Sequence, residues 1–147
     1  MNHIVISHLV DYLQSMLGHR ITYSRCGGGA SSILLLHTDN NYSLMCWRYW
    51  EISVHIDLLA CSEDDDTAIV GKMAVAARRI EDKKLLGFFI DDDFSLVLMF
   101  EEDITLTVFI EDFSGVELIY WELYNTKRSP VTFIVNENGE LIETECE

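Results

Sequence analysis

The stretch Phe94–Ile110, FSLVLMFEEDITLTVFI, decides the fold, because a mainly apolar run precedes Glu101-Glu102-Asp103 and a run that alternates apolar residues with Thr105 and Thr107 follows it. Alternation with a period of two is the pattern of a strand with one buried face, and a polar turn between two such runs predicts a β-hairpin. Residues 34–47, LLLHTDNNYSLMCW, repeat this pattern without a gap against residues 96–109, LVLMFEEDITLTVF. The chain is therefore expected to contain the same hairpin twice.

The repeat extends upstream of each hairpin. Leu17-Gly18-x-x-Ile21 recurs as Leu86-Gly87-x-x-Ile90, and copy one has seven more residues between its glycine and its hairpin (16 positions against 9). Apolar residues at three- and four-residue spacings predict a helix in each copy, over His3–Leu17 and Thr67–Lys84. Two copies of helix, Leu-Gly, strand and hairpin would build one antiparallel sheet with two helices.

The remaining segments add strands to this sheet. Ile52–Leu59 alternates and predicts a single strand that buries Ile52, Val54, Ile56 and Leu58. Glu117–Tyr124 predicts another strand, and Asn136–Gly139 predicts a type I′ turn in a C-terminal hairpin over residues 131–145. We expect an α+β fold, with a mostly antiparallel, twisted sheet of about eight strands and two helices.

Composition predicts one globular domain over residues 1–147, with repeat halves at about 3–59 and 68–124. The chain is 49% hydrophobic with a single proline, so no linker is visible. No apolar stretch approaches the roughly 18 residues of a membrane span, and the N-terminus lacks a signal-peptide pattern, which favours a cytoplasmic protein. Four widely spaced cysteines and five histidines form no C-x-x-C or H-x-x-x-H pair, so no metal and no cofactor is expected.

The negative charge of −15 is concentrated in the second half of the chain. Residues 1–73 contain 4 basic and 8 acidic residues, whereas residues 74–147 contain 6 and 17. Glu63–Asp66 are expected to begin the second helix, with Ser62 as N-cap, and Glu101–Asp103 to form the hairpin tip. Asp91, Asp92 and Asp93 would then lie beside Glu111 and Asp112 at the hairpin base, since antiparallel neighbours are about 5 Å apart.

Five converging carboxylates have three interpretations. A divalent cation site lacks the expected loop spacing, and a catalytic carboxylate pair would need a cleft lined by aromatic residues. The third interpretation is a docking surface for a basic protein, which the carboxylates would attract electrostatically. We expect the third, because no other chemistry accompanies the acids; a DNA mimic would need carboxylates spaced like phosphates along an extended face.

Trp47-Arg48-Tyr49-Trp50 combines the residue types that dominate protein–protein hot spots. In a strand, Trp47 and Tyr49 share one face while Arg48 and Trp50 share the other. One pair is expected in the core and the other at the surface. Arg48 and Trp50 are the candidate partner-binding anchors.

An alternative function centres on Cys26-Gly27-Gly28-Gly29. A thiolate beside backbone N–H groups, with His37 or His55 as base and Asp57 as orienting group, would follow the logic of thiol-dependent hydrolysis. The glycines also suit a plain loop, and no phosphate-loop pattern is present. This alternative predicts a β-rich domain that binds or hydrolyses a small molecule.

The chain resembles the small acidic immunity proteins encoded beside bacterial polymorphic toxins, including those of contact-dependent growth inhibition systems. The two L-G-x-x-I segments, the strand Ser43–Arg48 and the closing Trp121-Glu122-Leu123 carry the resemblance, together with size and charge over most of the chain. It implies a cytosolic, non-catalytic protein that binds a cognate toxin domain, often a basic nuclease, and blocks its active site or the approach of its substrate. We expect no binding to nucleic acid or membrane.

Overall fold

The computed structural model describes residues 3–26, 33–47, 49–62, 64, 71–110, 119–127 and 129–145. These residues form two helices and 11 antiparallel strands in two sheets, so the predicted α+β class is confirmed. The elements are α1 (His3–Met16), β1 (Ile21–Arg25), β2 (Leu34–Thr38), β3 (Tyr42–Cys46), β4 (Trp50–Val54), β5 (Asp57–Cys61), α2 (Lys72–Ile80), β6 (Leu85–Ile90), β7 (Leu96–Phe100), β8 (Ile104–Val108), β9 (Trp121–Asn125), β10 (Ser129–Val135) and β11 (Leu141–Glu145).

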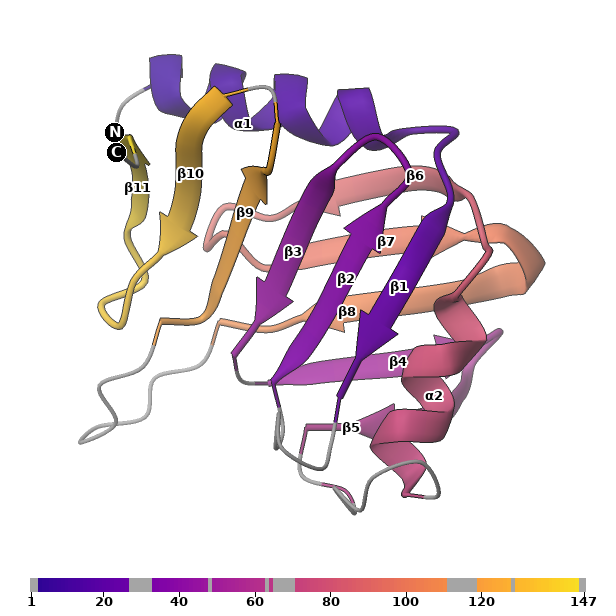
Figure 1. Cartoon of the computed structure of the whole chain (residues 1–147). Coiled ribbons are helices and arrows are strands. Elements are labelled where there is room, and N and C mark those ends of the chain that lie inside the picture. Colours follow the sequence, from indigo (N-terminus) through magenta and orange to yellow (C-terminus); the bar gives the residue numbers. More distant parts are fainter. Residues whose placement is uncertain are drawn as a thin grey trace.

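The strands form two sheets rather than the single sheet expected. The first sheet has the order β1-β2-β3-β9-β10-β11 and the second has the order β5-β4-β8-β7-β6. Figure 1 shows them face to face, with the second sheet behind the first and its strands running across those of the first. One core of buried apolar side chains from both inner faces fills the space between them.

The two halves of the chain have the same architecture. We call α1 to β5 the N-terminal half and α2 to β10 the C-terminal half; β11 follows as an extra strand. Each half builds a three-stranded meander in one sheet and sends a hairpin into the other sheet: β4-β5 pairs with β8, and β9-β10 pairs with β3. The halves therefore exchange hairpins, and neither sheet belongs to one half alone (Figure 1).

Strand registers match between the halves. Leu34 pairs with Cys46 as Leu96 pairs with Val108, which is the register that the sequence repeat predicted. Trp121 pairs with this Cys46, and Trp50 pairs with this Val108, so the two tryptophans occupy equivalent sites. Both are fully buried. The equivalence therefore extends into the exchanged hairpins, beyond the range over which the sequence pattern was visible.

The two sheets meet at a corner that also obeys this relation. Arg20 and Lys84, just before β1 and β6, form an antiparallel bridge. The Ile21 N–H donates to the Lys83 carbonyl (3.0 Å), and equivalently the Leu85 N–H donates to the His19 carbonyl (3.0 Å). An approximate two-fold axis thus passes through this bridge and relates the halves.

The alignment of the two Leu-Gly segments was wrong. Gly18 has φ +80° just after α1, and its structural equivalent is Asp82, with φ +68°, just after α2. Gly87 instead lies inside β6, at a bulge, and is equivalent to Tyr23 of β1. The N-terminal half has only two more residues between first strand and hairpin, 13 positions from Ile21 to Leu34 against 11 in the other half.

The predicted strand Ile52–Leu59 is a hairpin of two strands. His55 adopts φ +57° and starts a turn between β4 and β5, which resets the alternation. Ile56, expected in the core, is therefore 96% exposed, and Leu58 is 54% exposed.

Two smaller predictions of local structure were also wrong. Helix α2 begins after Gly71, and the Ser62 hydroxyl, expected as its N-cap, instead accepts a hydrogen bond from the Trp50 N–H (3.3 Å). The C-terminal hairpin is present, but its turn is not type I′, because Gly139 has a positive φ and Asn138 does not. The Asn136 side-chain oxygen accepts hydrogen bonds from the N–H groups of Asn138 and Glu140 (3.0 Å each). These bonds hold the turn in place of the expected type I′ conformation at Asn138-Gly139.

Candidate partner-binding surface

The turn Asp91–Phe94 joins β6 to β7 and has a fixed geometry. The Phe94 N–H donates to the Asp91 carbonyl (2.9 Å), and the Asp91 N–H donates to the Ser95 carbonyl (3.0 Å). Phe94 adopts φ +71°, and its carbonyl accepts a hydrogen bond from Nε1 of the buried Trp121 (3.0 Å). A core tryptophan of the exchanged hairpin therefore holds this surface turn in place.

The three aspartates of the turn are exposed. Asp91 Oδ1 accepts the Asp92 N–H and Asp93 Oδ1 accepts the Ser95 N–H, both at 2.9 Å. In the part of the chain that the structure describes, no Lys, Arg or His forms an ion pair with them. Repulsion among the three charges is thus not relieved by a cation within that part.

An apolar hollow of about 420 Å³ adjoins this turn. Helix α1 and strand β6 supply apolar walls, and the turn supplies two carboxylates and a phenylalanine. We call this site the acidic hollow; it is lined by Ile6, Val10, Phe88, Phe89, Ile90, Asp91, Asp92 and Phe94. Phe89 is 59% exposed, so an aromatic face is open to a partner beside the carboxylates.

The predicted convergence of five carboxylates can be followed in the structure only up to Ile110, the last described residue of the segment that leaves β8. The Ile110 N–H donates to the Ser95 hydroxyl (3.3 Å), so the segment that leaves β8 runs beside the aspartate turn. Glu111 and Asp112 lie outside the described residues, as does the candidate anchor Arg48. The structure thus brings Asp91, Asp92 and Asp93 together, and its description ends before the other candidate acids.

The acids at the β7–β8 tip, by contrast, have basic side chains as partners. Arg20 approaches Glu101 (3.3 Å), Lys83 approaches Glu102 (3.1 Å), and His55 approaches Asp103 (3.2 Å). The pKa of Glu101 lies below its usual value, chiefly because its carboxylate accepts the Lys84 N–H (2.8 Å) and secondarily because of Arg20. Glu101 and Glu102 therefore connect this tip to the corner between the sheets, and Asp103 connects it to the β4–β5 turn.

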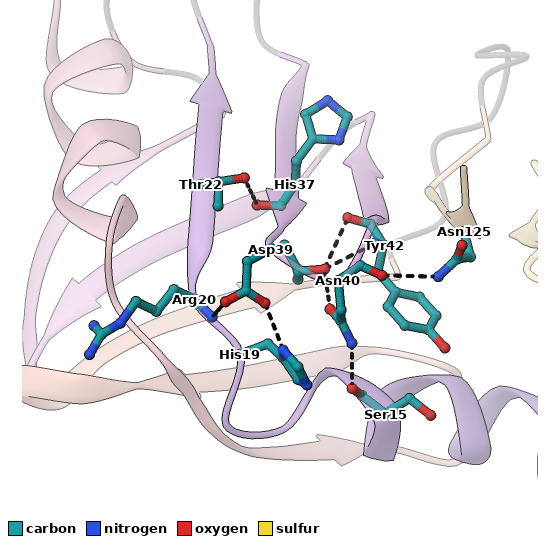
Figure 2. A network of polar contacts seen from close by, with 10 residues as sticks. Ser15, His19, Arg20, Thr22, His37, Asp39, Asn40, Tyr42 and Asn125 are labelled. Atoms are coloured by element: carbon teal, nitrogen blue, oxygen red, sulfur yellow. Dashed lines mark hydrogen bonds and ion pairs between the residues drawn. The ribbon is translucent and has the colours of Figure 1, made fainter. Parts of the chain in front are cut away.

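The equivalent corner of the N-terminal half uses polar contacts of the same kind (Figure 2). The Asp39 carboxylate accepts hydrogen bonds from His19 Nδ1 (2.6 Å) and from the Arg20 N–H (3.4 Å). The Glu101 carboxylate likewise accepts a hydrogen bond from the Lys84 N–H. Asn40 donates to the Ser15 carbonyl (2.8 Å) and so ties the β2–β3 turn to α1. Both tips thus join elements, which leaves the aspartate turn as the acidic run that has no ion-pair partner among the described residues.

The candidate anchor Trp50 was wrongly placed at the surface. It is 0% exposed and pairs with Val108 in the middle of the second sheet. The alternation argument failed because Tyr49 has φ +55° and interrupts the chain between β3 and β4. Trp47 is half-buried on the first sheet, where Nε1 donates to Glu122 Oε1 (3.4 Å).

The geometry gives little support to the alternative of thiol-dependent hydrolysis at Cys26. Cys26 is only 6% exposed, and Gly27–Gly29 lie outside the described residues. The proposed bases are engaged elsewhere: His37 Nδ1 bonds the Ser43 hydroxyl, and His55 pairs with Asp103. Burial lowers the pKa of His37. Burial also raises the pKa of the thiol of Cys46, which interacts with Cys26. A buried thiol in these surroundings is a core residue rather than an accessible nucleophile.

Three exposed apolar residues on or beside β6 were missed by the sequence reasoning. Leu86 is 61% exposed, Phe89 59% and Met99, on neighbouring β7, 41%. Strand β6 reads LLGFFI, which has no polar alternation and is typical of a strand buried on both faces. The absence of alternation was the available signal that one apolar face needs a cover.

No protein-family model matches the chain, and no curated protein or solved structure matches it significantly. Within the described ranges, no three His, Cys, Asp or Glu side chains gather as a metal site requires. Neither α1 nor α2 is long and apolar enough to cross a membrane.

Proposed function

We propose that this protein is a non-catalytic immunity protein that binds and neutralises a basic, nuclease-type toxin domain. The acidic hollow is the observation that supports the proposal, because apolar walls there adjoin carboxylates that no described cation neutralises. Its exposed aromatic ring and rigid aspartate turn provide both an apolar contact and a negative charge at one place.

The chemistry of the hollow suits a lysine or arginine side chain of the partner. The aliphatic stem of such a side chain would lie against Phe88 and Phe89, and its charge would reach Asp91 or Asp92. A guanidinium over the open Phe89 ring would add a cation–π contact. Because the turn is held by Trp121, little ordering would be needed on binding, which favours affinity.

Neutralisation would follow from what the captured cations normally do. A nuclease holds the phosphate backbone of its substrate with lysine and arginine side chains. A partner that occupies these side chains competes with the substrate for them. The net charge of −15 would accelerate the encounter and would repel nucleic acid from the complex.

The proposal is tested by mixing the protein with the toxin domain encoded in the neighbouring upstream reading frame and following association by stopped-flow fluorescence. We expect a complex whose association rate falls with added salt. In the variant D91N/D92N the rate at low ionic strength should fall by about tenfold, because the steering charge at the hollow is gone. The amide oxygen that D91N introduces can still accept the N–H of residue 92, so the turn should persist.

The matched control is D57N/D82N, which removes the same charge from exposed sites away from the hollow. Asp57 lies on β5, at the opposite edge of the second sheet from β6, and asparagine suits the positive φ of position 82. This control should slow association much less. Equal slowing by both variants would show that only net charge matters, and the absence of any complex would reject the proposed function.

A further inference from the structure

A second hollow, of about 400 Å³, lies at the other end of β6. We call it the β6–β7 hollow; its walls come from the outer face of the second sheet and from the β4–β5 turn. It is lined by His55, Leu86, Gly87, Met99, Phe100, Asp103, Ile104 and Thr105. The pairs Gly87–Met99 and Met99–Thr105 form its floor across three neighbouring strands.

The two-fold relation identifies the corresponding place in the N-terminal half. There Tyr23 pairs with His37 and His37 with Ser43, in the same registers and at the same bulge. The backbone agrees as well, since the Thr126 N–H donates to the Asn41 carbonyl (2.9 Å) as the His55 N–H donates to the Asp103 carbonyl (3.0 Å).

In the N-terminal half this place is filled by an aromatic ring. The Tyr23 ring lies on the His37 ring, with centroids 5.4 Å apart and planes tilted by 32°. In the C-terminal half Gly87 occupies the position of Tyr23 and supplies no side chain, and Met99 occupies that of His37. The tip of Met99 lies 3.1 Å from where a Cβ on Gly87 would be. The β6–β7 hollow thus lies at the place that a tyrosine ring takes in the other half, and the tip of Met99 occupies part of that place.

We propose that the β6–β7 hollow binds an aromatic side chain of the partner protein, and that a tyrosine ring fits it best; this rests on the proposed function. The ring would take the place that Tyr23 has in the N-terminal half. Met99 is flexible and its sulfur favours aromatic contacts, so it can move aside and pack on the ring. The exposed Asp103 carboxylate at the rim would accept the phenolic O–H.

Continuity with the acidic hollow argues for a protein as the source of this ring. Leu86 and Gly87 line one hollow and Phe88–Ile90 line the other, so both lie along one strand and about 10 Å apart. Each hollow includes one strongly exposed apolar residue of this strand, Leu86 in the first and Phe89 in the second. A basic protein docked along β6 would place a cation in one hollow and an aromatic ring in the other, which is the residue pairing that dominates interface hot spots.

The first experiment uses p-cresol, the side-chain analogue of tyrosine, and amide NMR spectra of the whole protein. We expect saturable shifts at the amides of Leu86, Gly87 and Thr105. They should disappear in G87Y/M99H, which reproduces the filled arrangement of the N-terminal half, and in T105F, which fills the hollow from β8 should the first variant not fold. They should persist in D91N/D92N. Shifts elsewhere, or shifts that survive both filled variants, would overturn the inference.

The second experiment measures the dissociation constant of the complex with the toxin domain. Filling the β6–β7 hollow should raise this constant by at least about tenfold while leaving the salt dependence of association unchanged. Cresol binding together with an unchanged dissociation constant would overturn the inference and leave the proposed function intact. Absence of any complex, with cresol still bound, would reject both and show that the hollow alone is real.

Discussion

Glu122 is a carboxylate in the middle of the first sheet's outer face, opposite Met45 on β3 and Ile134 on β10. Burial raises its pKa, and the hydrogen bond from Trp47 opposes part of that rise. A carboxyl group whose pKa is raised by folding favours its protonated form in the folded state. Its ionisation therefore costs stability as the pH rises above the unfolded pKa, and the cost is absent below that value.

Replacement of Glu122 by glutamine should stabilise the protein at neutral pH, because it removes the buried charge and keeps an acceptor for Trp47. We expect a gain of less than about 1 kcal/mol, since the group is partly solvated. The gain should be full near pH 8 and should vanish near pH 4, at the usual glutamate pKa. Urea unfolding midpoints across this range measure it. A difference that does not change with pH would show that charge burial is not its cause, and E140Q serves as the exposed control.

Helices α1 and α2 end in the same way with different residues. Three buried residues of α1, namely Leu9, Leu13 and Met16, correspond to Met73, Ala77 and Ile80 of α2. Two residues after each helix the backbone turns left-handed, at Gly18 with φ +80° and at Asp82 with φ +68°. Glycine adopts this conformation without strain, whereas aspartate pays a steric penalty.

The two helix ends should therefore respond differently to substitution. G18A should lower the free energy of unfolding by about 1 kcal/mol, because no neighbouring atom lies near the added methyl and only the backbone is strained. D82G should raise it by about 0.5 kcal/mol or leave it unchanged, as relief of strain is offset by a more flexible unfolded chain. Urea midpoints of the two variants measure the contrast, and destabilisation of similar size by both would contradict the equivalence of the two ends.

Elements with strict alternation or helical spacing could be predicted from the sequence, whereas their arrangement could not. The register of Leu34–Trp47 against Leu96–Phe109 was readable because every second residue is apolar in both. The break at Tyr49 was not, because a positive φ at a tyrosine has no sequence signal and shifts every later side chain to the other face. The same holds for His55. These two residues decide that Trp50 is buried and Ile56 exposed.

Only the charged residues of the candidate site could be predicted from the sequence. Asp91–Asp93 were visible as a run of acids, and their place beside β8 followed from the hairpin. The hollows are lined by segments far apart in the sequence, such as Ile6 of α1 and Phe88 of β6, and one of them depends on the glycine at the position equivalent to Tyr23. Long-range packing of this kind leaves no local pattern in one sequence.

Because the halves exchange hairpins, we expect the whole molecule to unfold as a single cooperative unit. Strand β3 pairs with β9 and strand β4 pairs with β8, so each half lacks an inner strand of its own sheet. Both tryptophans at these junctions are fully buried by contributions from the other half. Unpaired strand edges and an open core would remain if either half stood alone.

Separate fragments covering residues 1–66 and 67–147 should therefore not fold as monomers. Mixed together, they should restore the native amide NMR spectrum, because each supplies the hairpin that the other lacks. Light scattering with circular dichroism distinguishes the outcomes, and folding of one fragment alone is expected only with dimerisation, in which two copies exchange hairpins. A folded monomer of residues 1–66 would contradict the view that the exchange is essential.

The same exchange has a consequence for synthesis on the ribosome. β3 ends at Cys46, but its partner β9 ends at Asn125, 79 residues later (125 − 46). At about 5–20 residues per second, the free edge of β3 waits roughly 4–16 s for that partner to emerge. During this interval the nascent chain presents an apolar strand edge, which makes it a client for chaperones and links the yield of the protein to the speed of translation through its second half.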